Sequence, residues 1–136
     1  MFFEMKTSPD VLEYNETQTA EHSDVCSSLA KLFSKNLPAA ESKVWHGHPV
    51  WFIDGNPVAG YSIKKSGVQV LFWSGQSFKT AGLKPIGKFK AAGFDVAKID
   101  ATTKSLLTEW LAEAQKIQWD YANLMKKRSL EKLTKF

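Results

Sequence analysis

The spacing of apolar residues along the chain changes twice and divides it into helical, extended and again helical parts. The first clear helical segment runs from about Thr19 to Asn36, where apolar residues recur at the three- and four-residue spacing of one helix face. Pro38 ends this pattern, and Ser8-Pro9-Asp10 favours the start of a shorter helix before it. The apolar stripe consists of Val25, Leu29, Leu32 and Phe33.

Between residues 43 and 73, short apolar runs alternate with turn residues, which is typical of an antiparallel meander. Pro49 and Asp54-Gly55-Asn56-Pro57 separate the first runs, and Ser66-Gly67 separates the last two. The expected strands are Lys43–His48, Trp51–Ile53, Val58–Lys64 and Val68–Trp73.

The remaining third of the chain is predicted to be irregular at first and then regular again. Residues 74–93 are rich in glycine and contain Pro85, and a final strand is expected at Phe94–Ile99. The strongest helical pattern of the chain follows, capped by Asp100 or Thr102 and about five turns long. Its apolar positions are Leu106, Leu107, Trp110, Leu111, Ala114, Ile117, Tyr121 and Leu124.

Helix, meander and helix in this order predict an α+β fold. We expect a two-layer sandwich in which N- and C-terminal helices cover one face of an antiparallel sheet. The 136 residues suffice for a single domain, 1–136, with a core of about 8–125 and a basic tail at 126–136. The absence of strand–helix alternation disfavours a doubly wound nucleotide-binding fold. We expect a monomer or a small homo-oligomer.

Composition and charge narrow the class of protein. Cys26 is the only cysteine, which excludes an internal disulfide and favours a reducing, cytoplasmic location. We see no signal peptide and no apolar run near the ~20 residues of a membrane span. The net charge is +4 and the isoelectric point about 9.1. Arg128 is nevertheless the only arginine, which disfavours a sequence-specific reader of nucleic acid.

The segment Trp45-His46-Gly47-His48-Pro49, followed by Val58–Lys64 and Val68–Gly75, resembles the YdhG-like family of small bacterial proteins of unknown function. The family pattern places an aromatic residue, Gly and Pro at alternate positions before a β-meander, and Gly87-Lys88 resembles its later Gly-Lys pair. The resemblance covers about Thr19 to Asn123. It implies a frataxin-like fold and, as for some members, iron binding and delivery to iron–sulfur or haem assembly proteins. It implies no catalytic residues.

Carboxylates near the N-terminus are the first candidates for such an iron site. Between Ser8 and Asp24 the chain has five acids and no Lys or Arg. Acids three residues apart share a helix face and can bind a hard cation, and the alternative is a plain solvated acidic surface. The candidate ligands are Glu13, Glu16, Glu21, Asp24 and His22.

His46 and His48 are a second candidate metal pair. On one strand, residues two apart point to the same face, so both imidazoles could meet one ion. Such a site needs a third ligand, which the sequence does not place. The alternative is that both are ordinary variable positions around a Gly–Pro turn.

Tryptophans and lysines are the candidates for binding a ligand or a partner. Trp45, Trp51 and Trp73 lie in the meander, either in the core or along a binding surface. Residues 82–89 nearly spell a phosphate-binding loop, but Phe89 stands where a hydroxyl must bind magnesium. The lysines of this segment are candidates for contact with an anionic partner, with a plain solvated surface as the alternative. They are Lys84, Lys88 and Lys90.

We find no Ser–His–Asp order, HExxH, CxxC or GxSxG motif on which a catalytic role could rest. The sequence therefore favours a non-catalytic binding protein, of iron or, as an interaction module, of an anionic partner. An enzyme with its pocket between Trp45 and Trp73 is the third hypothesis.

Overall fold

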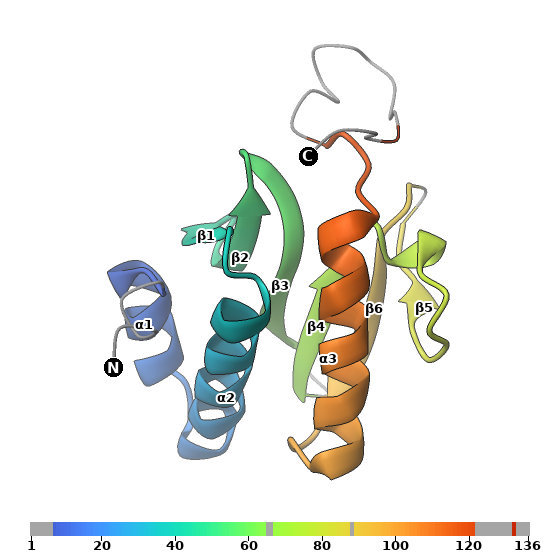
Figure 1. Ribbon diagram of the computed structural model, residues 1–136. Helices are drawn as coiled ribbons and strands as arrows, with labels where there is room; N and C mark the ends of the chain where they lie inside the picture. The colour runs from blue at the N-terminus through green and yellow to red at the C-terminus, as the bar shows by residue number, and fades with distance from the viewer. Residues whose placement is uncertain (1–6, 65–66, 88, 122–131, 133–136) are drawn as a thin grey trace.

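The computed structural model describes residues 7–64, 67–87, 89–121 and 132, and it has two layers, a sheet and a set of helices (Figure 1). Helices α1 (Pro9–Glu16), α2 (Ala20–Asn36) and α3 (Ala101–Lys116) pack against the same face of the sheet. The expected α+β sandwich, with N- and C-terminal helices on one face of an antiparallel sheet, is confirmed.

The sheet has six antiparallel strands in the order β1-β2-β3-β4-β6-β5. Four of them form the expected meander, and β6 adds to its end beside β4. Along the chain, the short 3₁₀ turn η2 (Gly75–Ser77) and β5 come between β4 and β6. The strands are β1 (Glu41–Trp45), β2 (His48–Ile53), β3 (Asn56–Lys64), β4 (Gly67–Phe72), β5 (Lys84–Pro85) and β6 (Ala92–Val96).

Helices α2 and α3 each begin directly after a residue whose side chain caps the helix. Thr19 accepts the His22 N–H through its side chain, and Asp100 accepts the Thr103 N–H at 2.8 Å. These oxygens satisfy backbone donors that have no partner inside the helix. The break between the first two helices therefore falls at Thr17–Thr19.

The last helix is shorter than its apolar pattern predicts. It ends at Lys116, and Ile117 has already left the helical region at φ −117° and ψ 104°. Tertiary hydrogen bonds hold the chain beyond it: the Trp119 N–H donates to Ser74 Oγ, and Asn56 Nδ2 donates to the Trp119 carbonyl. Leu124 lies outside the described residues.

The first hairpin also differs from the prediction. The extended segment does not continue to His48, because His46 and Gly47 form a two-residue turn with φ values of 52° and 85°. Positive φ at both central residues is the geometry that matches the twist of a hairpin. Pro49 therefore lies inside β2, opposite Val44, rather than ending a strand.

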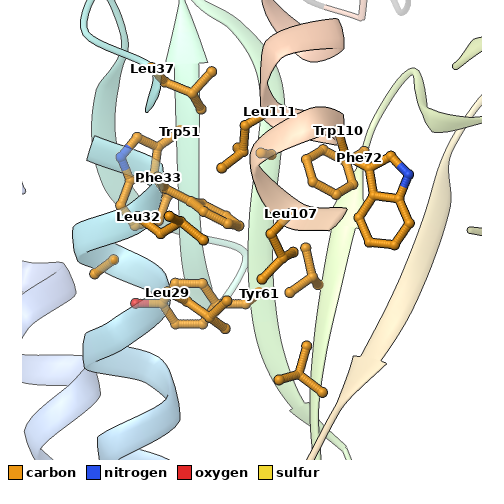
Figure 2. Packing of buried hydrophobic residues seen from close by; sticks show 14 of the residues in the cluster. Leu29, Leu32, Phe33, Leu37, Trp51, Tyr61, Phe72, Leu107, Trp110 and Leu111 are labelled. Carbon is orange, nitrogen blue, oxygen red and sulfur yellow. The ribbon is translucent and has the colours of Figure 1, made fainter. Parts of the chain in front are cut away.

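The core lies between the helices and the inner face of the sheet (Figure 2). Phe33 of α2 packs edge-on against Trp51, with ring centroids 5.0 Å apart, and Phe72 packs against Trp110 of α3 at 6.0 Å. The Tyr61 hydroxyl donates to buried Asn15 of α1 at 2.6 Å, so each helix is tied to the sheet. None of the described helices is long and apolar enough to cross a membrane.

Candidate functional site

The register of the sheet places one continuous row of residues on the face that no described helix covers. The row begins and ends with a lysine on an edge strand and has apolar residues or glycine between. We call this side the open face. In strand order the row is Lys43, Val50, Gly60, Leu71, Gly93 and Lys84.

The neighbouring row, one residue along each strand, belongs to the main core. Side chains of successive residues therefore alternate between the two faces of the sheet. Because neighbouring residues of a strand point to opposite faces, this row faces the helices. It includes Trp51, Ala59 and Phe72, all members of the main hydrophobic cluster. Val50 is also fully buried but does not belong to that cluster. A second, smaller apolar layer therefore lies on the open face.

An aromatic cluster forms this second layer. Trp45 is its centre: its ring centroid lies 4.3 Å from His46, 5.3 Å from Phe52 and 6.3 Å from Trp73. Phe52 is buried, Trp45 and Trp73 are half-buried, and His46 is exposed. The Lys43 ammonium lies 4.8 Å from the centre of the Phe52 ring, within cation–π range. The cluster thus presents indole and imidazole rings to solvent beside a cation.

Gly60 allows the cluster to lie close to the sheet. A Cβ at this position would come within 2.6 Å of the Pro49 carbonyl oxygen and 3.3 Å of the Trp73 ring. Trp73 therefore rests directly on the backbone of β3. A larger residue at position 60 would lift the indole away from Trp45.

His48 lies at the edge of the cluster in a neutral environment. Burial lowers the pKa of its imidazole, and the positive charges of Lys64 and His46 lower it further. Its Nδ1 is buried and finds no hydrogen-bond partner among the described residues. These effects disfavour a protonated His48 in the folded protein.

The structure distributes the predicted metal ligands over separate places. Glu13 and Glu16 are exposed on α1, and Glu21 and Asp24 are exposed on α2, with His22 half-buried between them. In the described part of the chain, no three or more His, Cys, Asp or Glu side chains lie together as a possible metal site. The expectation that His46 and His48 share one strand is wrong, since His46 lies in the turn and only His48 lies in β2.

The predicted partner-binding residues also separate. Trp51 is 1% exposed and packs in the main core, so it offers no surface to a partner. Lys84 is exposed on the edge strand β5 and belongs to the row of the open face. Lys90 is half-buried, with its ammonium 4.8 Å from the centre of the Trp119 ring. Lys88 lies outside the described residues.

The near match to a phosphate-binding loop has a different local structure. Lys84 and Pro85 form strand β5 within it, whereas a phosphate-binding loop must lead directly into a helix. A pocket of about 210 Å³ beside this segment is lined by Gly75, Phe78, Gly82, Leu83, Pro85 and others, with no titratable side chain among them. This pocket gives no chemical role to the segment.

Cys26 has the environment of a core residue. It is fully buried, and burial raises the pKa of its thiol to about 11. A thiol with a raised pKa is a poor nucleophile at neutral pH.

Sequence reasoning missed several residues of the open face. Lys43, Phe52, Gly60 and Leu71 carry no motif, and only the alternation of each strand together with the pairing register brings them together. The available signal was the alternation in Val68–Trp73, which separates Leu71 and Trp73 from the core positions Val70 and Phe72.

No family model, curated protein or solved structure matches this chain.

Proposed function

We propose that this protein is a small, non-catalytic binding protein that recognises an anionic partner on the open face of its sheet. The single observation that carries the proposal is the row across the sheet, with Lys43 on one edge strand and Lys84 on the other. Both side chains are exposed. A face that no described helix covers and that has a cation at each edge suits a ligand that carries several negative charges.

A charge-reversal series tests this function. A fluorescent polyglutamate peptide serves as the probe, and its anisotropy is measured at low and at high salt. We expect Lys43→Glu and Lys84→Glu to weaken binding and high salt to weaken it further, because exposed charges are screened. Lys31→Glu is the matched control. It makes the same change in net charge at an exposed position of α2, which lies on the other side of the sheet from the open face. Equal losses in all three variants would remove the open face from the proposal.

Iron binding is the second candidate function, and the exposed acids of α1 and α2 favour it. Glu13 with Glu16, and Glu21 with Asp24, are pairs three residues apart on successive helices. Two carboxylates leave most coordination positions of an iron ion to water or to a partner, so we expect weak binding. This proposal also rests on the resemblance of Trp45, Gly47 and Pro49 to the YdhG-like pattern.

Anaerobic titration with ferrous iron tests the second candidate. Paramagnetic iron should broaden the backbone NMR signals of residues 13–24, and Glu13→Gln combined with Glu16→Gln should reduce that broadening. The absence of saturable broadening in this segment would exclude the candidate. Loss of iron binding and loss of polyanion binding are independent results, because the two sets of residues do not overlap.

A further inference from the structure

We propose that the open face is a stacking platform for single-stranded nucleic acid, bound without sequence preference. This inference rests on the proposed function, since it names the class of the anionic partner. Nucleic acid single strands combine regularly spaced negative charges with flat aromatic bases. The open face combines a lysine at each edge with flat aromatic side chains.

The aromatic side chains are available for stacking. His46 is exposed at the hairpin tip, and its ring is tilted by 56° against that of Trp45, with the two centroids 4.3 Å apart. Trp73 continues the same cluster at 6.3 Å from Trp45. Bases stack on such rings irrespective of their identity, because every base has an aromatic face. Two indole rings and an imidazole thus provide a surface of the right kind for two or three bases.

The lysines lie where the phosphates of such a strand would pass. Lys43 and Lys84 are at opposite ends of a row that crosses six strands, which corresponds to about 24 Å. Lys64, at the end of β3, lies off this row, because it pairs with Gly67 beyond the Ser62–Gln69 pair that is in register with Asp95. A nucleic acid single strand that follows this row would therefore meet a lysine at each edge of the sheet and the aromatic cluster beside Lys43.

Two acids on the open face restrict the path that a nucleic acid single strand can take across the sheet. Glu41 pairs with Phe52 in the register and Asp95 pairs with Gln69, so both project from the open face and both are exposed. They lie in the rows on either side of the lysine row. The phosphate backbone is therefore expected to follow the lysine row itself.

The chemistry favours a single strand over two other polyanions. A double helix hides its bases, so it would use the lysines and leave the aromatic cluster unoccupied. An acidic peptide would likewise use the charges alone. Sequence specificity is not expected, since the bidentate base contacts that provide it come mainly from arginine and the only arginine is Arg128.

The test uses a fluorescein-labelled oligothymidylate of about 12 nucleotides. Anisotropy titrations are run with the full chain between about 50 and 200 mM salt. For the unchanged protein we expect the logarithm of the affinity to fall linearly with the logarithm of the salt concentration. Two lysine–phosphate contacts correspond to a slope of about −1.4. The duplex and the polyglutamate peptide serve as comparison probes and should bind more weakly than the single strand.

Two variants separate stacking from charge. Trp45→Leu should weaken oligothymidylate binding about tenfold at every salt concentration and leave the slope unchanged. Lys43→Glu should make the slope shallower, whereas the control Lys31→Glu should have a much smaller effect. Because Trp45 is half-buried, thermal unfolding of Trp45→Leu is checked first. His46→Ala, at an exposed turn position, replaces it if the variant does not fold.

The possible outcomes distinguish this inference from the proposed function. If the single strand and polyglutamate bind equally well and Trp45→Leu and His46→Ala change neither, the stacking platform is wrong and the anionic partner is an acidic protein. If a duplex binds as tightly as the single strand, the inference also fails. If no probe binds at low salt, both the inference and the proposed function are wrong.

Discussion

At the scale of single residues, Gly60 has the strictest steric requirement on the open face. Its neighbours are the Pro49 backbone on one side and the Trp73 ring on the other, and the backbone oxygen cannot move without disturbing the β2–β3 pairing. The absence of a side chain therefore decides how closely the aromatic cluster packs. Gly93 has a similar role farther along the row, with the Ile86 side chain above it.

Gly60→Ala should lower the free energy of unfolding by about 2 kcal/mol, as expected for a methyl group forced into a filled space. Denaturation in urea, followed by circular dichroism, measures the change. Ser62→Ala on the same strand is the control and should stay within about 0.5 kcal/mol of the unchanged protein. A stable Gly60→Ala variant would contradict the close approach of Trp73 to β3.

His48 should make the protein less stable as the pH falls. Its pKa is lowered in the folded protein, so below the ordinary value the unfolded chain takes up the proton more readily. The unfolding free energy should therefore decrease as the pH falls from about 7 through the ordinary histidine pKa of about 6.5. His48→Gln should flatten this part of the profile, measured by urea denaturation at a series of pH values. An identical profile in the variant would show that other groups cause the dependence.

At the scale of elements, α1 protects one edge of the sheet. The edge strand β1 has a backbone donor directed away from β2: the Val44 N–H donates to Asp10 Oδ2 of α1 at 2.8 Å. The Ser8 N–H donates to Ser42 Oγ at 2.9 Å in the same region. At the other edge, β5 has only two residues, one of them Pro85. Short edges, proline and covering segments all prevent pairing with other chains.

Asp10→Ala should weaken this protection, because Val44 loses a charged acceptor. Burial of Asp10 raises the pKa of its carboxyl, but hydrogen bonds from Ser8, Val44 and Val11 outweigh this and leave the pKa below its ordinary value. The variant should lose about 1 kcal/mol of stability, and the Val44 amide should exchange its hydrogen faster. Glu13→Ala, exposed on the same helix, is the control. Unchanged exchange at Val44 would mean that α1 does not protect the edge.

At the scale of the whole molecule, the two faces of the sheet have unequal roles. The helix side holds the main core, in which Leu29, Leu107 and Leu111 are fully buried between helices and sheet (Figure 2). The open face carries the smaller aromatic cluster and the row that ends in lysines. Stability should therefore depend chiefly on the helix side, which leaves the open face available for binding.

A pair of leucine substitutions compares the two faces. Leu29→Ala leaves a cavity in the main core and should cost about 3 kcal/mol. Leu71→Ala removes a half-buried side chain from the open face and should cost clearly less, because water can fill the space. Urea denaturation of both variants gives the comparison. Equal losses would indicate that the open face is covered in the folded protein.

The sequence by itself determined the fold class and most of the elements, although it did not predict β5. Apolar periodicity located α2 and the start of α3, and turn residues such as Asp54-Gly55 located the β2–β3 hairpin, because these signals act over a few neighbouring residues. The sequence did not predict the turn at His46-Gly47, because histidine carries no strong turn signal. It also failed at the end of α3, where distant groups on Ser74 and Asn56 hold the chain beyond Lys116.

Only the tertiary structure decided where the candidate site lies. Lys43 and Lys84 are 41 positions apart in the chain, yet the register places them in one row across the sheet. Similarly, Trp51 and Trp73 look alike in the sequence, but Trp51 in β2 points into the core, whereas Trp73, directly after β4, lies against Gly60 on the open face. Strand pairing joins residues that are distant in the chain, and a shift of one position exchanges the two faces. Local patterns therefore fix the strands but leave open which side chains share a face.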